Sequence, residues 1–402
     1  MQNRRGFLVG AGALALGGTG AVLPFKALAA DSLALPFANG ERPLVQYPQK
    51  RPLIGLTARP PQLETPFAVF DEGAITPNDA FFVRYHLSNL PLNFDPATFV
   101  LEVKGSVEHP LRLPLDDLRA FEPVELVAVN QCSGNSRGFF EPRVAGGQLG
   151  NGAMGNARWR GVSLRAVLDR ADVRAGARQV TFDGLDAAPA DGVPDFVKAL
   201  DIDHARDGEV MLAYEMNGAP LPVLNGFPLR LVVPGYYGTY WVKHLHEITV
   251  LDEVFGGFWM QTAYRIPDND CACVPPGTAP QATVPIHRFT VRSFITNVAE
   301  GTQVAADREL SLRGIAFDGG SGIAEVAVSA DGGMNWRTAR LGADLGRYSF
   351  RQWEAAVRLA PGAHELRVRA TSRAGETQPE TPRWNPAGYM RNVIESVRVV
   401  AA

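Results

Sequence analysis

The sequence predicts an α+β protein in which a mixed α/β domain is followed by an immunoglobulin-like β-sandwich. Residues 30–283 mix strand-like and helix-like stretches, whereas residues 284–402 contain short alternating strands at regular spacing. A proline-rich stretch, residues 275–285, separates the two regions and is typical of a domain join. Without its first 29 residues the chain keeps about 370, which is enough for two domains.

Residues 1–29 have the pattern of a twin-arginine export signal. Arg4 and Arg5 precede a small-residue apolar stretch, residues 9–21, and an A-x-A cleavage site ends at Ala29. The alternative is a membrane anchor, but glycines interrupt the stretch and it is shorter than the roughly 20 residues of a span. We therefore expect no membrane span and a mature protein in the bacterial periplasm. Because this route exports folded proteins, we also expect a cofactor to be loaded before export.

The first domain contains both strand and helix patterns. Apolar, β-branched residues predict strands at 99–103, 180–182 and 229–233. Residues 163–171 predict a helix, in which Ser163 is placed to cap the segment LRAVLDRA. This mixture predicts a mixed α+β domain.

The second domain is predicted to contain seven strands. They span residues 289–295, 309–317, 323–329, 336–341, 348–359, 364–370 and 395–400. Asp331, Gly332 and Gly333 form one of the turn signals between them. The pattern is that of an immunoglobulin-type sandwich without the cysteine pair of antibody domains.

Cys132 is the strongest candidate for a functional residue. It follows the apolar run at residues 124–129, so it is expected where a strand ends and a loop begins. Arg137, five positions on, can stabilise negative charge. A thiolate there can be a metal ligand, a nucleophile or a redox thiol. The alternative is a buried, inert cysteine.

The other two of the three cysteines, Cys271 and Cys273, are separated only by Ala272 and could pair or bind a metal. We do not expect disulfides to hold this fold. The chain has no C-x-x-C-H motif, so no c-type haem is expected to be bound covalently. A formal net charge of -3 gives no sign of nucleic-acid binding.

Several basic residues of the first domain form a second group of candidates. Arg84 and His86 are two positions apart, so on a strand both side chains would face the same side. Arg230 begins an apolar strand and Lys243 follows a glycine turn. With backbone groups near Gly235 and Gly238, they could hold the phosphate of a large cofactor. Each could instead be an ordinary solvated surface charge.

These residues lie in motifs that resemble the sulfite oxidase family of molybdopterin enzymes, in particular the molybdenum subunits of bacterial sulfite dehydrogenases. The motifs are N-Q-C-S-G-N-S-R, F-F-V-R-Y-H, G-L-D, N-G-F-P-L-R and W-N-P-A-G-Y, which begin at residues 130, 81, 184, 225 and 384. The resemblance covers almost the whole chain. It implies a molybdopterin-binding catalytic domain at residues 30–283 and a dimerisation-type sandwich at residues 284–402.

The resemblance also implies roles for individual residues. Cys132 would supply the protein thiolate to molybdenum, a soft ligand that suits such a metal. The residues matching the active site are Arg84, His86, Arg137 and Tyr264. Those matching the pterin-binding positions are Tyr85, His86, Asp186, Asn225, Arg230, Trp241, Val242 and Lys243. Asn225 and Tyr85 depart from animal sulfite oxidases, which have histidine and asparagine there.

The implied activity is oxidation of sulfite to sulfate, with one molybdenum–molybdopterin group per chain. Because no haem or flavin domain is expected in this chain, electrons would pass singly to a separate c-type cytochrome, either a subunit or a soluble protein. A heterodimer with the cytochrome is favoured and a homodimer is the alternative. Three other functions stay open: a sulfane dehydrogenase of thiosulfate oxidation, a reductase of protein-bound methionine sulfoxide, and a non-catalytic periplasmic binding module.

Overall fold

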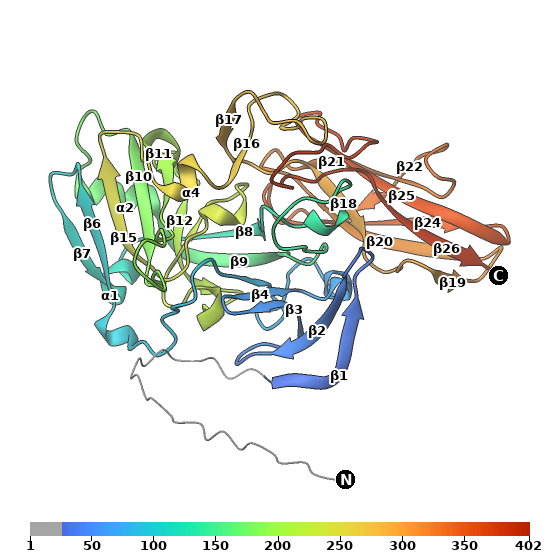
Figure 1. Ribbon diagram of the computed structural model, residues 1–402, viewed down its shortest axis with the longest axis horizontal. Coiled ribbons are helices and arrows are strands. Elements are labelled where there is room, and N and C mark those ends of the chain that lie inside the picture. Colours follow the sequence, from blue (N-terminus) through green and yellow to red (C-terminus); the bar gives the residue numbers. More distant parts are fainter. Residues whose placement is uncertain (1–25) are drawn as a thin grey trace, which may run out of the picture.

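The computed structural model of the chain describes residues 26–402 (Figure 1). Residues 1–25 of the predicted export signal lie outside the described residues, and residues 26–29 belong to the first strand, β1 (Lys26–Ala34). The described part consists mainly of strands, and its four α-helices are short. Within residues 26–402, no helix has both the length and the apolar character needed to cross a membrane.

The first sheet is an antiparallel ribbon whose strands follow sequence order. After β1 it contains β2 (Glu41–Gln46), β3 (Leu53–Ala58), β4 (Pro61–Glu64) and β5 (Val83–Arg84). Leu53 and Leu63 of this sheet pack with Tyr85 in a small buried cluster. Arg84 pairs with Gln62 at the edge of the ribbon, so this sheet fixes the backbone of one predicted site residue.

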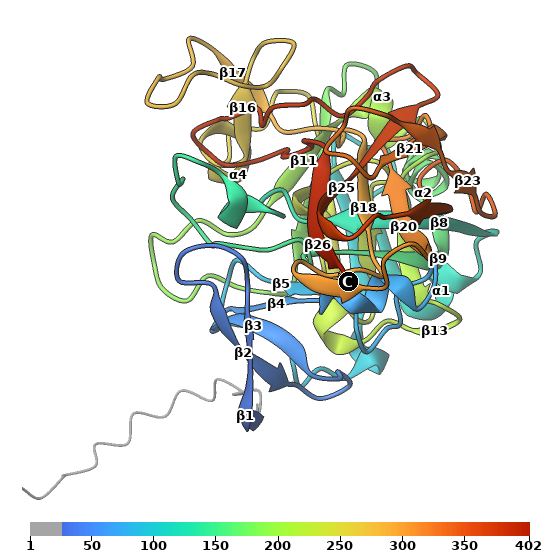
Figure 2. The ribbon, with the colours of Figure 1, turned by 90° about the vertical axis from the view of Figure 1, so that its right-hand side faces the viewer.

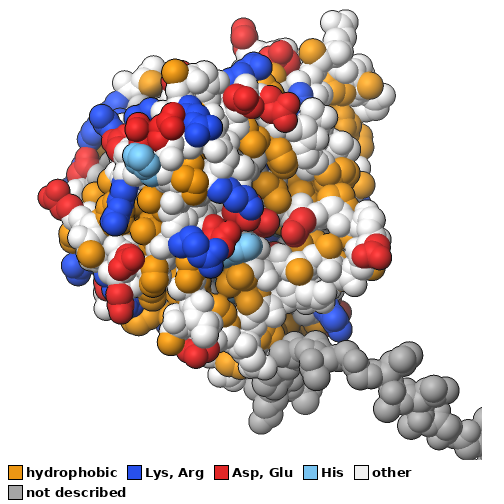
Figure 3. Space-filling model, turned by 90° about the vertical axis from the view of Figure 1, so that its left-hand side faces the viewer, with side chains coloured by type: hydrophobic (Ala, Val, Ile, Leu, Met, Phe, Trp, Pro, Cys, Tyr) orange, Lys and Arg blue, Asp and Glu red, His pale blue; other side chains and the backbone are white. Residues whose placement is uncertain are grey.

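The second sheet lies at the end of the molecule remote from the sandwich (Figure 1). Its strand order is β11 (Lys198–Asp201), β10 (Gln179–Gly184), β15 (Leu245–Leu251), β6 (Val100–Gly105) and β7 (Leu111–Pro114). The strands predicted at 99–103 and 180–182 correspond to β6 and β10. The outer face at this end mixes positive and negative side chains, so it offers no patch of one sign (Figure 3).

The α-helices pack beside these sheets or at their ends. They are α1 (Leu115–Arg119), α2 (Leu164–Ala171), α3 (Ile202–Ala205) and α4 (Phe258–Gln261). Helix α2 buries Leu164, Val167, Leu168 and Ala171, the spacing of one helical face. The predicted helix is confirmed, and Ser163 holds the N-cap position. The sequence pattern also predicts a capping hydrogen bond to its side chain, and the structure does not contain this bond.

The third sheet carries the predicted site. It contains β13 (Ala219–Pro220), β12 (Met211–Met216), β9 (Met154–Ser163) and β8 (Pro123–Gln131), and β14 (Arg230–Val232) pairs with β12. Cys132 directly follows β8, as predicted, and Arg230 is the first residue of β14. One sheet therefore places both residues.

The C-terminal domain is a sandwich of two sheets. One contains β18 (Arg292–Ile295), β20 (Glu309–Phe317), β24 (Arg351–Arg358) and β23 (Arg340–Leu341). The other contains β19 (Thr302–Val304), β26 (Glu395–Ala401), β25 (Gly362–Ser372), β21 (Ile323–Ser329) and β22 (Arg337–Thr338). Apolar side chains from both sheets, among them Leu312, Val326 and Val368, form its core.

The strands predicted at 289–295 and 348–359 are shorter in the structure, as β18 and β24, and two further details differ from the sequence prediction. The strand predicted at 336–341 is two short strands, because β22 pairs with β21 in one sheet and β23 pairs with β24 in the other. The chain changes sheets at Ala339, which is buried between them. Strand β19 was not predicted, since three residues are too few to show alternation.

The two domains share a core. Phe70 contacts Phe350 with ring centroids 5.9 Å apart, and Phe67 contacts Phe294 at 5.5 Å. The backbone N–H of Val129 in β8 donates to the carbonyl of Tyr348 at 2.9 Å. Figure 2, seen from the sandwich end, shows the sandwich strands in front of the sheets of the first domain.

A hairpin of β16 (Arg265–Pro267) and β17 (Thr283–Pro285) spans the predicted domain join. In its loop, Cys271 and Cys273 form a disulfide, which resolves the alternatives that the sequence left open. Asn269 also shapes this loop: its side chain accepts from the N–H of Cys273 at 3.2 Å and donates to the carbonyl of Cys273 at 2.9 Å. A disulfide between residues two apart constrains little chain, so it does not hold the fold together.

Candidate functional site

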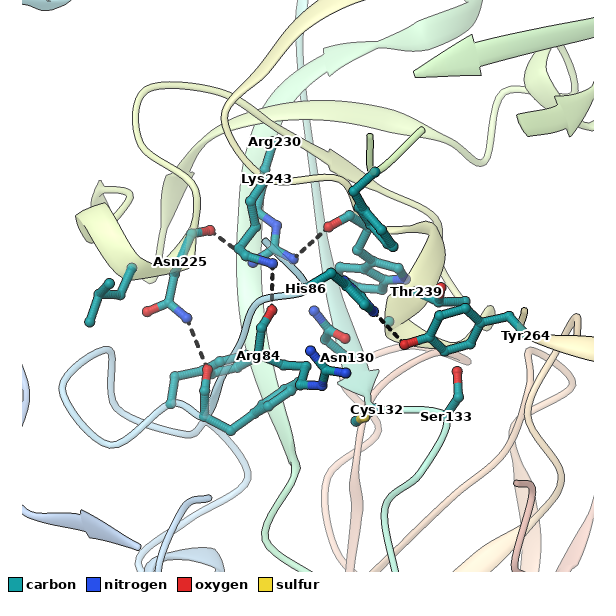
Figure 4. Close-up of a pocket in the computed structure, with 16 residues that line it drawn as sticks. Arg84, His86, Asn130, Cys132, Ser133, Asn225, Arg230, Thr239, Lys243 and Tyr264 are labelled. Carbon is teal, nitrogen blue, oxygen red and sulfur yellow. Dashed lines mark hydrogen bonds between the residues drawn. The ribbon is translucent and has the colours of Figure 1, made fainter. Parts of the chain in front are cut away.

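Most of the predicted site residues line two connected cavities, and Figure 4 shows the inner one. The inner pocket is lined by Phe81, Phe82, Arg84, His86, Asn130, Cys132, Ser133, Phe196, Leu224, Asn225, Arg230, Gly238, Thr239, Trp241, Lys243 and Tyr264. A wider outer opening of about 1040 Å³ shares Arg84, His86, Cys132 and Tyr264 with it and adds Arg137, Tyr389 and further residues. Cys132 therefore lies where the inner pocket meets the route from outside.

The loop after β8 holds Cys132 in a fixed position. The backbone N–H of Cys132 donates to the carbonyl of Ala153 at 2.9 Å, and the side chain of Asn135 accepts from the N–H of Ala153 at 2.9 Å. Cys132 is a free thiol with 8% of its surface exposed. Buried Arg292 of the sandwich donates to the hydroxyl of Ser136 at 3.0 Å, so the second domain supports the same loop.

Arg84, His86 and Tyr264 meet at the boundary of the two cavities. The sequence predicted that Arg84 and His86 face one side, and both line the pocket, although β5 ends before His86. His86 Nε2 is hydrogen-bonded to the hydroxyl of Tyr264, and its ring stacks on Phe196 at 3.8 Å. Burial, then the charges of Arg84, Lys243 and Lys198, hold the pKa of His86 well below its usual value. The imidazole is therefore neutral at physiological pH.

Arg137 lines the outer opening. Its Nε donates to the carbonyl of Ala387 at 3.0 Å and its Nη1 to that of Gly147 at 3.3 Å. Within residues 26–402, neither Arg137 nor Arg84 forms an ion pair with a carboxylate. The opening therefore presents two uncompensated positive charges near Cys132, an arrangement that suits a small anion.

The inner wall contains two further cations without a paired carboxylate among the described residues. Arg230 donates to the carbonyls of Asn225 at 2.9 Å and Trp241 at 3.3 Å, and burial lowers its pKa to about 9. Lys243 donates to the carbonyl of Arg84 at 2.7 Å, and burial lowers its pKa to about 7. The charge of nearby Asp186 raises the pKa of Lys243 but does not offset the effect of burial. Buried cations are costly unless enough opposite charge is near, so this wall fits a further anionic group.

Unpaired polar atoms in the same pocket point to a ligand of many hydrogen bonds. Four buried atoms lack a hydrogen-bond partner among the described residues: Asn130 Oδ1, Ser133 Oγ, Thr239 Oγ1 and Arg230 Nε. Buried polar atoms are nearly always paired, by protein, water or ligand. A Cβ atom at Gly238 would lie 2.3 Å from Asn130 Oδ1, so the pocket wall has no room for a side chain at this position. A phosphorylated pterin fits these donors, acceptors and cations.

Of the residues implied by the resemblance, eight line the inner pocket and Arg137 lines only the opening. Tyr85, Asp186 and Val242 line neither cavity. The hydroxyl of Tyr85 is 2.6 Å from His244 Nε2, and burial raises the pKa of Asp186 to about 6. Gly235 was expected at the phosphate site, but it packs against the sandwich. A Cβ atom at position 235 would lie only 2.2 Å from the carbonyl oxygen of Gly319.

Asn225 lies in the pocket wall, but its side chain is already engaged. Its Oδ1 accepts from Lys50 Nζ at 2.5 Å, and its Nδ2 donates to the carbonyl of Phe82 at 3.1 Å. Lys50 was not noticed in the sequence. Burial lowers its pKa to about 7.

Two more residues near the site were missed. Lys198 Nζ lies 5.3 Å from the ring centroid of Tyr264 and donates to the carbonyl of Trp259 at 2.6 Å. A lysine within the apolar run before residue 201 was the available signal. Tyr389 belongs to a motif that was noticed, but nothing local in the sequence shows that it reaches Arg137.

Comparisons with known proteins show which families the two parts of the chain match. Residues 87–259 match the family described as the oxidoreductase molybdopterin binding domain, and residues 283–401 match the Mo-co oxidoreductase dimerisation domain. The chain is 34% identical to mitochondrial sulfite oxidase of Homo sapiens over 383 residues, covering 90% of this chain and 69% of that protein. It is 30% identical to sulfite oxidase of Arabidopsis thaliana, covering 89% of this chain and 96% of that one.

A solved structure is also similar. The crystal structure of the sulfane dehydrogenase SoxCD from Paracoccus pantotrophus superposes with a TM-score of 0.72 at 27% identity, covering 85% of each chain. The similarity includes most of both domains described above.

Proposed function

Because the chain belongs to the sulfite oxidase family of molybdenum enzymes, we propose that it oxidises sulfite to sulfate and passes the electrons singly to a c-type cytochrome. The observation that carries the proposal is the position of Cys132. Its free thiol lies between an inner pocket rich in unpaired cations and donors and an outer opening lined by Arg84 and Arg137.

The residues of the inner pocket would hold the cofactor. Cys132 would bind molybdenum as a thiolate, and Arg230 and Lys243 would neutralise the phosphate of the pterin. Thr239 and Asn130 offer buried polar atoms for its remaining hydrogen bonds. When bound, the molybdenum–pterin group supplies the two-electron oxidation in which sulfite gains an oxygen derived from water.

The residues of the outer opening would bind and orient the substrate. Sulfite is anionic near neutral pH, so the guanidinium groups of Arg84 and Arg137 stabilise it in a poorly hydrated site. The neutral ring of His86 holds the hydroxyl of Tyr264, and the resulting pair can orient one sulfite oxygen. Because His86 is neutral, it adds no charge that would retain the sulfate product.

Further parts of the proposal concern partners and location. No C-x-x-C-H motif is present, which supports a separate cytochrome as electron acceptor. We propose a periplasmic protein, exported by the twin-arginine route with one molybdenum–pterin group per chain, in a heterodimer with that cytochrome. The match to a dimerisation domain supports a homodimer as the second arrangement.

The decisive experiment measures sulfite-dependent reduction of cytochrome c by the purified periplasmic protein, with molybdenum quantified in the same sample. We expect about one molybdenum per chain, and loss of both metal and activity in Cys132→Ser. A protein without molybdenum would contradict the cofactor assignment and favour a binding module. Metal without turnover of sulfite would contradict the substrate and point to a sulfane or sulfoxide.

A second candidate is a sulfane dehydrogenase. The likeness to SoxCD supports it, and so does the volume of the outer opening, about 1040 Å³, which greatly exceeds the space that a sulfite ion fills. A carrier protein with a sulfane sulfur on a cysteine would be tested against free sulfite at equal concentration. Turnover of the carrier alone would select this candidate.

A further inference from the structure

The last loop of the sandwich reaches into the outer opening. We call residues 384–389 the closing segment. The carbonyl of Ala387 accepts from Arg137 Nε at 3.0 Å, and Trp384 Nε1 donates to the carbonyl of Pro142 at 2.9 Å. The closing segment therefore holds the loop around Arg137 at two points.

Tyr389, at the end of the closing segment, lies against the guanidinium group. The Cζ atom of Arg137 is 5.0 Å from the centroid of the Tyr389 ring, within the range of a cation–π contact. The same ring stacks on Tyr264, with centroids 5.5 Å apart and planes 7° from parallel. Tyr389 thus contacts both the candidate anion-binding arginine and the pocket tyrosine.

The neighbouring glycine allows this close approach. Gly388 has a φ of +60°, and a Cβ there would lie 2.3 Å from Val144 Cγ2 and 2.9 Å from Arg137 Cγ. The backbone of the closing segment therefore packs directly on the aliphatic part of Arg137. A larger residue at position 388 would push Tyr389 off the guanidinium.

An aromatic partner has a specific advantage over a carboxylate. An aspartate or glutamate would also orient Arg137, but it would neutralise the charge needed for the substrate. The face of a tyrosine ring attracts the guanidinium and leaves its net charge available. Arg137 has no carboxylate within ion-pair distance among residues 26–402, which agrees with this arrangement.

We propose that Tyr389 is a positioning residue that holds Arg137 in the orientation that binds the substrate anion. The proposal rests on the proposed function for the identity of the anion as sulfite. It assigns to the sandwich domain a direct part in substrate specificity, through one side chain.

The test compares holoenzymes of Tyr389→Phe, Tyr389→Leu and Tyr389→Met with Arg137→Ala and the double variant Arg137→Ala/Tyr389→Leu. Phenylalanine keeps the aromatic face and loses only the hydrogen bond between the Tyr389 hydroxyl and Arg137, so its KM for sulfite should rise less than that of the aliphatic variants. Leucine or methionine should raise KM by about 3- to 30-fold, the range of a cation–π contact, with kcat changed much less. Molybdenum content shows whether each variant contains the cofactor. The test needs only one of the two aliphatic variants to contain it.

The double variant shows whether Tyr389 acts through Arg137. Its KM should equal that of Arg137→Ala alone, because the ring then has no guanidinium to hold. Additive effects, or an unchanged KM in the loaded aliphatic variants, would overturn the proposal. Binding of sulfate to each holoenzyme, measured by calorimetry, decides the same question if the wild type does not oxidise sulfite. Failure of the proposed function is therefore distinguishable from failure of the role of Tyr389.

Discussion

Arg84 and Arg137 are proposed to bind the same anion, but the protein holds them in different ways. Arg84 lies on β5, where its backbone is fixed by the first sheet, and Arg137 is fixed through contacts of its side chain. Both guanidinium groups reach the opening that leads to Cys132. Two cations from unrelated segments can therefore act on one anion.

We predict that Arg84→Ala raises the KM for sulfite. A hydrogen bond to a charged group contributes about 1.5–3 kcal/mol, which corresponds to roughly 10- to 150-fold in affinity. Steady-state kinetics with molybdenum-normalised enzyme would measure this. Arg158→Ala is the control, because Arg158 forms an exposed pair with Glu125, and its KM should be unchanged. Equal KM values in the wild type and Arg84→Ala would contradict the role.

His244 gives the stability of the protein a defined dependence on pH. Its Nδ1 donates to the carbonyl of Phe227 at 2.6 Å, so its Nε2 accepts from the hydroxyl of Tyr85. Burial, with smaller effects from Lys243 and Arg230, lowers its pKa to about 3. The unfolded imidazole protonates near pH 6.5, so below that pH the unfolded state binds more protons and stability falls.

We predict that this loss disappears in His244→Asn. Asparagine tolerates the positive φ of +53° and can keep the bond to Phe227. The free energy of unfolding of the wild type, minus that of the variant, should fall by at most about 1.4 kcal/mol per pH unit between pH 6.5 and 4. Denaturant unfolding at several pH values would measure it. A difference independent of pH would show that His244 titrates normally in the folded protein.

The site residues differ in how far the sequence could predict them. Cys132 and Arg230 could be predicted because each stands beside an apolar strand, a pattern visible within a few residues. Lys50 and Tyr389 could not, since Asn225 is 175 positions away from Lys50 and Arg137 is more than 200 positions away from Tyr389. Chemistry that depends on such distant contacts appears only when the chain is folded.

At the level of elements, the short helix η5 (Gly238–Tyr240) forms one edge of the inner pocket. We predict that Gly238→Ala lowers the molybdenum content. The added methyl group would meet Asn130 Oδ1 at 2.3 Å, and such overpacking costs about 1–3 kcal/mol. Gly73→Ala is the matched control, because a Cβ at Gly73 meets nothing within 4 Å. Metal analysis of both variants would decide, and equal metal content would contradict the close fit.

Elements with strong periodicity were predicted well, and their partners were not. Strands β20 and β21 have the predicted bounds, because nine and seven residues of alternation give a clear pattern. The split of residues 336–341 into β22 and β23 depends on the neighbouring strands, because β22 pairs with β21 and β23 pairs with β24. Ser163 marks the start of α2 by its backbone, while the orientation of its hydroxyl is set by the packing around it.

The whole molecule behaves as one packed unit across its two domains. Phenylalanines from both sides form edge contacts, and a buried arginine of the sandwich supports the cysteine loop. We predict a single calorimetric unfolding transition for the loaded protein. A chain ending at residue 283 should not retain molybdenum. Two separate transitions would indicate that the shared core contributes little.

The Cys271–Cys273 disulfide has a consequence for following the protein in the cell. Thiols stay reduced in the cytoplasm, and Asn269 shapes the loop without them, so the chain can fold there before the bond forms. If export follows the twin-arginine route, the disulfide forms only after a molecule has left the cytoplasm, so the oxidised form marks exported molecules. Acid-quenched cells should then contain a long form with two alkylatable loop thiols and a short form about 2 Da lighter than its reduced counterpart. The change of the ratio of the two forms with time after protein synthesis is stopped, followed by mass spectrometry, would give the transport rate without any added reporter.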